Sequence, residues 1–127
     1  MSEPNAMKNL VVWTDIPVTD LDRAAAFYAG VLARKVTREA YNGVPFAVVE
    51  HTEGSGACLV VKPRETSPFG LLVYFNVDGR IQEALARTES LGGKVVQGLH
   101  PIGPHGFRAI IEDSEGNRLA LHSTVDA

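Results

Sequence analysis

With 127 residues, 45% of them hydrophobic, the chain can bury one substantial core but is short for two independent ones, so a single domain is expected. The formal net charge of −3 is spread along the chain without a basic block, which argues against a nucleic-acid partner. No apolar run is long enough to span a membrane, the N-terminus lacks a signal-peptide pattern, and the one cysteine, Cys58, cannot form an intrachain disulfide, so we expect a cytoplasmic protein with no membrane partner.

The first half of the chain predicts the order strand, helix, strand, strand, strand. Residues 9–18 are rich in β-forming side chains up to Pro17, a residue that strands tolerate only near their ends. A capping box at residues 19–22 then starts a helix, whose apolar residues from Leu21 to Leu32 recur at helical spacing. Three short strands are expected at residues 34–40, 45–50 and 57–62, separated by glycine-containing turns.

The second half predicts the same order. A strand at residues 71–77 precedes Asp78, which we expect to cap a helix with an apolar face from Ile81 to Leu91, and three strands follow at residues 94–99, 107–112 and 118–123. The domain therefore divides into a tail (1–8), a first βαβββ unit (9–66) and a second βαβββ unit (67–127). We expect the tail before Met7 to be disordered.

Individual residues repeat between the two halves as well. Five residues from Val18 to Val36 recur at a constant offset of 59 residues, Val18 itself as Val77. Residues 48–54 resemble residues 110–116 at an offset of 62 residues. Two matches in the same order indicate an internal duplication, and the offsets locate each position of one half in the other.

Two motifs resemble a known family. The segment IPVTDLDRA at residues 16–24, followed by Phe27-Tyr28, and the closing stretch from Gly106 through the turn DSEGN at residues 113–117 are similar to the vicinal oxygen chelate superfamily, which includes glyoxalase I, bleomycin-resistance proteins and extradiol dioxygenases. The resemblance implies an α+β fold in which two paired βαβββ units form curved mixed sheets around a cavity for a small organic molecule. It also implies a homodimer, in which the two halves of a cavity often come from different subunits. Because one scaffold hosts lyases, isomerases, dioxygenases and pure binders, the resemblance leaves the activity open.

Metal-dependent members of that superfamily carry His, Glu or Gln at four cavity-facing positions. Carried onto this chain, the positions fall on Trp13, Leu72, Ala120 and Cys58, with a slip of two residues replacing Cys58 by Val60. Only the cysteine could bind a metal, and a lone cysteine is a poor site. We therefore expect no cofactor and disfavour a divalent metal. Without a metal ion, glyoxalase-type isomerisation and extradiol ring cleavage lose their main source of stabilisation.

Because strand side chains alternate, the residues two positions further along face the cavity again: Asp15, Val60, Tyr74 and His122. Asp15 and His122 are candidates for a general acid/base pair. The alternatives are that Asp15 caps the following helix, that His122 is an exposed rim residue and that Tyr74 is a wall residue.

Trp13 can fill volume or stack on a flat ligand, and His105 borders a loop of prolines and glycines that can act as a lid. The leading hypothesis is a metal-independent small-molecule-binding protein. Its expected ligand-binding residues are Trp13, Tyr74, Leu72, Cys58, Val60, Ala120 and His105. One alternative is a metal-independent lyase or isomerase that uses Asp15 and His122; another is a metal-dependent glyoxalase- or dioxygenase-like enzyme with displaced ligands.

Overall fold

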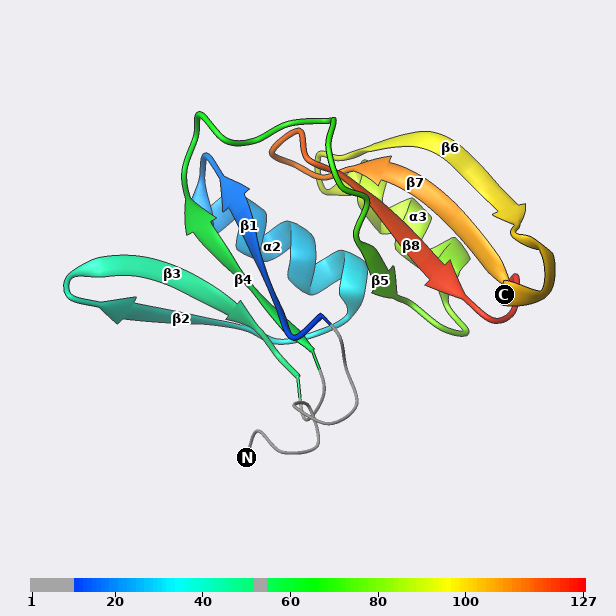
Figure 1. The fold of residues 1–127 in the computed structure, drawn as a ribbon, viewed down its shortest axis with the longest axis horizontal. Coiled ribbons are helices and arrows are strands. Elements are labelled where there is room, and N and C mark those ends of the chain that lie inside the picture. The colour runs from blue at the N-terminus through cyan, green and yellow to red at the C-terminus, as the bar shows by residue number, and fades with distance from the viewer. Residues whose placement is uncertain (1–10, 52–54) are drawn as a thin grey trace.

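The computed structural model describes residues 11–51 and 55–127, so the predictions for the tail lie outside the described residues. The elements follow the order that the sequence predicts (Figure 1). The first unit consists of β1 (Trp13–Val18), α2 (Leu21–Leu32), β2 (Val36–Tyr41), β3 (Val44–Val49) and β4 (Gly56–Val61). The second consists of β5 (Tyr74–Asn76), α3 (Ile81–Ser90), β6 (Lys94–Pro101), the short 3₁₀ turn η1 (Gly103–His105), β7 (Phe107–Glu112) and β8 (Arg118–Ser123).

Each unit forms its own mixed four-stranded sheet, with strand orders β1-β4-β3-β2 and β5-β8-β7-β6. In each sheet the first strand runs parallel to the last one, and the other pairs are antiparallel. The registers agree with the sequence offsets: Asp15 pairs with Cys58 in the first sheet, and the offsets carry this pair onto Tyr74 and Ala120, which pair in the second. The predicted α+β fold of paired βαβββ units is confirmed.

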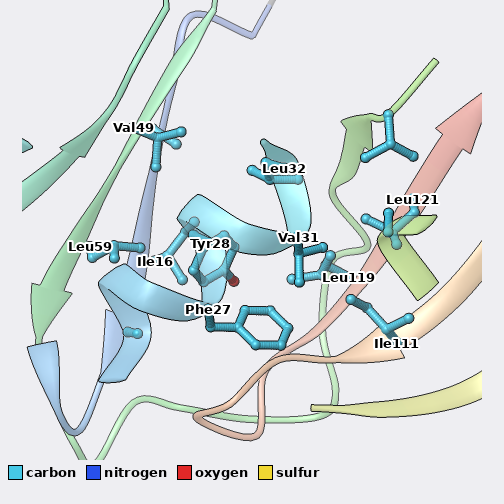
Figure 2. Packing of buried hydrophobic residues seen from close by; sticks show 14 of the residues in the cluster. Ile16, Phe27, Tyr28, Val31, Leu32, Val49, Leu59, Ile111, Leu119 and Leu121 are labelled. Carbon is cyan, nitrogen blue, oxygen red and sulfur yellow. The ribbon is translucent and has the colours of Figure 1, made fainter. Parts of the chain in front are cut away.

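The helix α2 lies between the two sheets and forms the centre of the core. Its side chains Phe27, Tyr28 and Val31 are buried, with Ile16 and its neighbours from the first sheet on one side (Figure 2). On the other side they meet apolar residues of the second sheet, among them Ile111. One continuous apolar cluster therefore spans both units. Neither helix of the described residues combines the length and the apolar character needed to cross a membrane.

The two helices begin in different ways. Asp20 is the N-cap of α2, because its carboxylate accepts a hydrogen bond from the backbone N–H of Arg23 at 3.0 Å. The prediction that Asp78 caps α3 was wrong: the N-cap position belongs to Arg80 and has no side-chain cap. Asp78 instead accepts hydrogen bonds from the backbone and hydroxyl of Thr124, which lowers the pKa of its carboxyl group and ties α3 to the end of β8.

The turn between β7 and β8 joins the second unit to the start of α2 through Glu115. Its carboxylate accepts backbone hydrogen bonds from Thr19 and Asp20 at 2.8 and 2.9 Å, and it forms a two-point ion pair with Arg23 at 2.8 and 3.0 Å. Burial on its own would raise the pKa of Glu115, but these donors and the hydroxyl of Ser114 outweigh burial and lower the pKa to about 2. Glu115 is therefore ionised and holds the units together electrostatically.

Asp113, in the same turn, makes a second set of buried contacts. Its carboxylate accepts a hydrogen bond from the hydroxyl of Tyr28 at 2.6 Å and from the backbone N–H groups of Glu115 and Asn117 at 2.8 Å. The amide of Asn117 donates to the backbone oxygen of Pro17 at 2.7 Å. Burial, followed by the negative charge of Asp113, raises the pKa of Tyr28 well above its ordinary value. The turn is thus a buried clasp between the units.

Candidate ligand-binding site

A hollow lies where β1 of the first sheet approaches the segment that leads into β5. Its volume is about 810 Å³. Trp13 and Asp15 form one wall, and residues 71–76, including Leu72 and Tyr74, form the opposite wall. The size suits a small organic molecule, and most of the lining is apolar.

An aromatic pair stands in this wall. The indole of Trp13, which is 42% exposed, meets the imidazole of His51 edge to face, with 5.4 Å between the ring centroids. Gly56 lies beneath both rings, and a Cβ atom there would come within 2.7 Å of each of them. The absence of a side chain at Gly56 therefore allows the two rings to pack against β4.

Asp15 and Cys58 are direct partners in the register between β1 and β4. The Cys58 thiol donates to the Asp15 carboxylate at 3.2 Å, and the cap of α2 is Asp20 rather than Asp15. Burial raises the pKa of Cys58, and the negative charge of Asp15 adds to the increase, whereas the contact with Trp13 acts against it. The thiol is thus neutral at physiological pH and acts as a hydrogen-bond donor rather than a nucleophile.

Polar side chains gather on the open face of the second sheet. The guanidinium of Arg108 donates to the hydroxyl of Tyr74 at 2.7 Å and to Nε2 of His100 at 3.0 Å. His100 completes the arrangement through a contact between Nδ1 and the backbone oxygen of Gly98 at 2.7 Å. Both contacts are satisfied when His100 is neutral and carries its proton on Nδ1.

A smaller hollow of about 380 Å³ lies beside Tyr74, which lines both hollows. His122 lines it, and its Nε2–H donates to the backbone oxygen of His105 at 2.7 Å. The side chain of His105 is exposed. Gly106 lies against the end of β8, where a Cβ atom would come within 2.6 Å of the backbone oxygen of Ser123. The absence of a side chain at Gly106 therefore lets the turn η1 approach β8, so that His105 and His122 can meet.

The structure separates the two candidate catalytic residues within one chain. Asp15 lines the larger hollow and contacts Cys58, while His122 lines the smaller one and contacts His105. Among the described residues no hydrogen bond joins Asp15 to His122. The acid/base pair therefore stays a prediction.

The four positions at which related proteins bind a metal do not fit a divalent ion here. Trp13 and Leu72 line the larger hollow, Ala120 is buried, and the Cys58 thiol is engaged by Asp15. No three or more His, Cys, Asp or Glu side chains come together as a metal site within residues 11–51 and 55–127. The donor chemistry of this chain therefore differs from that of a three- or four-ligand centre.

Sequence reasoning missed three residues of this region. Strand alternation could have identified Arg108, because its neighbour Ala109 is a core residue and Arg108 must then face outward. His51 and Gly56 carry no such signal, since their roles depend on how closely Trp13 packs against β4.

The family model for the Glyoxalase/Bleomycin resistance protein/Dioxygenase superfamily matches residues 10–121. The chain belongs to this superfamily. A glyoxylase-like domain-containing protein of Didymella fabae is 29% identical over 114 residues, which is 84% of this chain and 88% of that protein.

Solved structures of superfamily members share the fold at low sequence identity. A glyoxalase/bleomycin resistance protein from Albidiferax ferrireducens T118 superposes with a TM-score of 0.72 at 15% identity, over 91% of this chain and 98% of that one. The genomically encoded fosfomycin resistance protein FosX from Listeria monocytogenes gives a TM-score of 0.69 at 16% identity, over 92% and 94% of the two chains. At such identities the likeness establishes the superfamily fold alone.

Proposed function

We propose that this superfamily member binds a small, flat organic molecule in the larger hollow and does so without a divalent metal ion. The observation that carries the proposal is the position of Trp13, whose indole is 42% exposed in the wall of a mostly apolar hollow of about 810 Å³. A flat ligand that covers the indole removes apolar surface from water and gains stacking contacts. The residues at the four metal positions supply no ligand set, which supports binding without a metal.

The proposal includes a homodimer that acts in the cytoplasm. Large apolar side chains are exposed at the tip of the β2–β3 hairpin, where Tyr41 and Val44 pair across the strands and are 74% and 63% exposed. A second copy would cover this surface. The reduced Cys58 suits a reducing compartment. Sedimentation equilibrium tests the dimer, and a monomer at micromolar concentration would contradict it.

Fluorescence tests the binding site directly, because Trp13 is the only tryptophan of the chain. Titration with a library of flat aromatic compounds, among them neutral naphthalene derivatives, should quench its emission in a saturable way. Affinities are then measured by calorimetry for wild type and for Trp13→Leu, which keeps an apolar side chain but removes the stacking surface. We expect Trp13→Leu to weaken binding about tenfold, consistent with about 0.5–1.5 kcal/mol for an aromatic pair plus lost buried area.

The matched control is Phe69→Leu, which removes an exposed aromatic ring that lines neither hollow. It should leave the affinities unchanged. Equal affinities for wild type and Trp13→Leu across the library would rule out the stacking role. Elemental analysis of protein purified without chelator tests the metal, and a stoichiometric divalent ion would contradict metal-independent binding.

A further inference from the structure

The polar side chains on the open face of the second sheet form a single row across its four strands. In the strand register Asn76 of β5 pairs with His122 of β8, His122 with Arg108 of β7, and Arg108 with His100 of β6. Paired residues share a face of a sheet, so these four nitrogen-bearing side chains lie side by side. No carboxylate belongs to the row.

The equivalent row of the first sheet has a different chemistry. There Pro17 pairs with Val60, Val60 with Phe46, and Phe46 with Glu39. The internal offsets equate the first three of these residues with Asn76, His122 and Arg108. Two halves that share a backbone arrangement thus carry three apolar residues followed by Glu39 on one sheet and a nitrogen-rich row on the other.

Within the nitrogen-rich row, hydrogen bonds hold Arg108 in place, but no acidic side chain of the described residues forms an ion pair with it. The Nε group and one N–H of Nη1 are fixed by His100 and Tyr74, and the guanidinium carbon lies 6.0 Å from the centre of the Tyr74 ring. The ion pairs of the described residues involve Arg23, Arg38 and Arg80, and not Arg108. Its remaining N–H groups have no hydrogen-bond partner among the described residues.

The neighbouring acid does not neutralise this charge. Asp78 lines the smaller hollow beside His122, but its carboxylate is occupied by the backbone and hydroxyl of Thr124 and by Ser123. Arg108 is therefore a fixed cation with free donors beside Tyr74. Arg108 lines neither hollow itself, but its neighbours Tyr74 and Asn76 on the same sheet line the larger one. A planar guanidinium with free N–H groups matches the geometry of a carboxylate.

We infer that the row around Arg108 binds the carboxylate of the ligand, so that the ligand is an aromatic monocarboxylic acid. The inference rests on the proposed function and names the chemical class that this function requires. Arg108 carries the one permanent positive charge of the row, which matches the single charge of a carboxylate. His100 is a positioning residue that acts through Arg108, and Tyr74 connects the charged row to the apolar hollow.

The test compares two probes of equal shape, 2-naphthoate and its neutral amide, 2-naphthamide, by calorimetry at pH 7.5. Wild type should bind the carboxylate about ten- to a hundredfold more tightly than the amide, as expected for charge-assisted hydrogen bonds. Arg108→Gln should remove this preference while leaving the affinity for 2-naphthamide within about twofold. Arg108→Lys keeps the charge without the planar fork and should lose most of the preference.

Arg87→Gln is the matched control, because it removes the same charge from the exposed face of α3. It should keep the full preference for the carboxylate. An equal affinity of wild type for both probes, or a preference that survives in both Arg108 variants, would overturn the inference while the proposed function stands. Binding of neither probe would overturn both.

Discussion

Replacing Glu115 by Gln should destabilise the protein by about 2–3 kcal/mol at pH 7. The change keeps the size of the side chain but removes the charge that pairs with Arg23 and accepts two backbone N–H groups. The pKa of Glu115 falls from 4.5 to about 2 in the folded protein, and a shift of this size corresponds to about 3 kcal/mol of stabilisation by the ionised form. Because Arg23 is half exposed, solvent reduces part of this gain.

The pH dependence gives the sharper test. A carboxyl group whose pKa is lowered by folding stabilises the protein above its unfolded pKa, and the stabilisation is lost as the pH falls from about 4.5 toward 2. Urea unfolding at pH 7, 5 and 3 should therefore show the difference between wild type and Glu115→Gln shrinking with acidity. Glu89→Gln, an exposed substitution on α3, is the control and should be nearly neutral. A Glu115→Gln variant as stable as this control at pH 7, or a difference undiminished at pH 3, would refute the electrostatic role of Glu115.

Three further predictions concern the clasp and the hollow. Tyr28→Phe should lower the free energy of unfolding in urea by about 1–3 kcal/mol, because Asp113 loses a buried hydrogen-bond donor. Since burial raises the pKa of Tyr28, wild type should also lose stability as the pH rises above 10, and the variant should lack this loss. Equal dependence of stability on pH above 10 in both proteins would contradict this prediction. Gly56→Ala should displace Trp13 and His51 and weaken the binding of 2-naphthamide severalfold, as measured by calorimetry. The control is Gly98→Ala, where a Cβ atom meets no atom within 4 Å and the affinity should not change. Equal affinities of the two variants for 2-naphthamide would exclude the packing role of Gly56. Cys58 should react slowly with iodoacetamide at pH 8 in the folded protein and rapidly in urea, since burial and Asp15 keep its thiol protonated; equal rates would disprove this.

Most elements could be predicted from the sequence because their signals are local. The helical spacing around Leu21–Leu32 placed α2, and the glycine-containing turns placed β4 and β8, all within a residue or two of their positions. The strand expected at residues 71–77 is shorter, Tyr74–Asn76, because in the register only these three residues pair with β8, while residues 71–73 contribute to the wall of the hollow.

What the sequence could not reveal depends on contacts between distant residues. The turn at residues 113–117 is polar, yet Asp113 and Glu115 are buried, because their partners Tyr28 and Thr19 lie more than 80 residues earlier in the chain. For the same reason Asp78 was expected to cap α3, although Thr124 is the partner that it binds. In the candidate site, alternation identified the face of each strand but not which side chains contact each other.

The clasp also bears on how the hollow keeps its shape. Trp13 stands on the first sheet and Tyr74 on the second, and no strand pairing joins the two sheets in the part of the chain that the structure describes. Their separation is set by α2, which packs between the sheets, and by the turn whose Glu115 and Asp113 hold both the start and the middle of that helix. The buried carboxylates of the turn therefore stabilise the fold and, at the same time, fix the distance between the aromatic wall and the charged row. The proposed aromatic acid would contact Trp13 on one half and Arg108 on the other, so the proposal requires such a fixed separation between the halves.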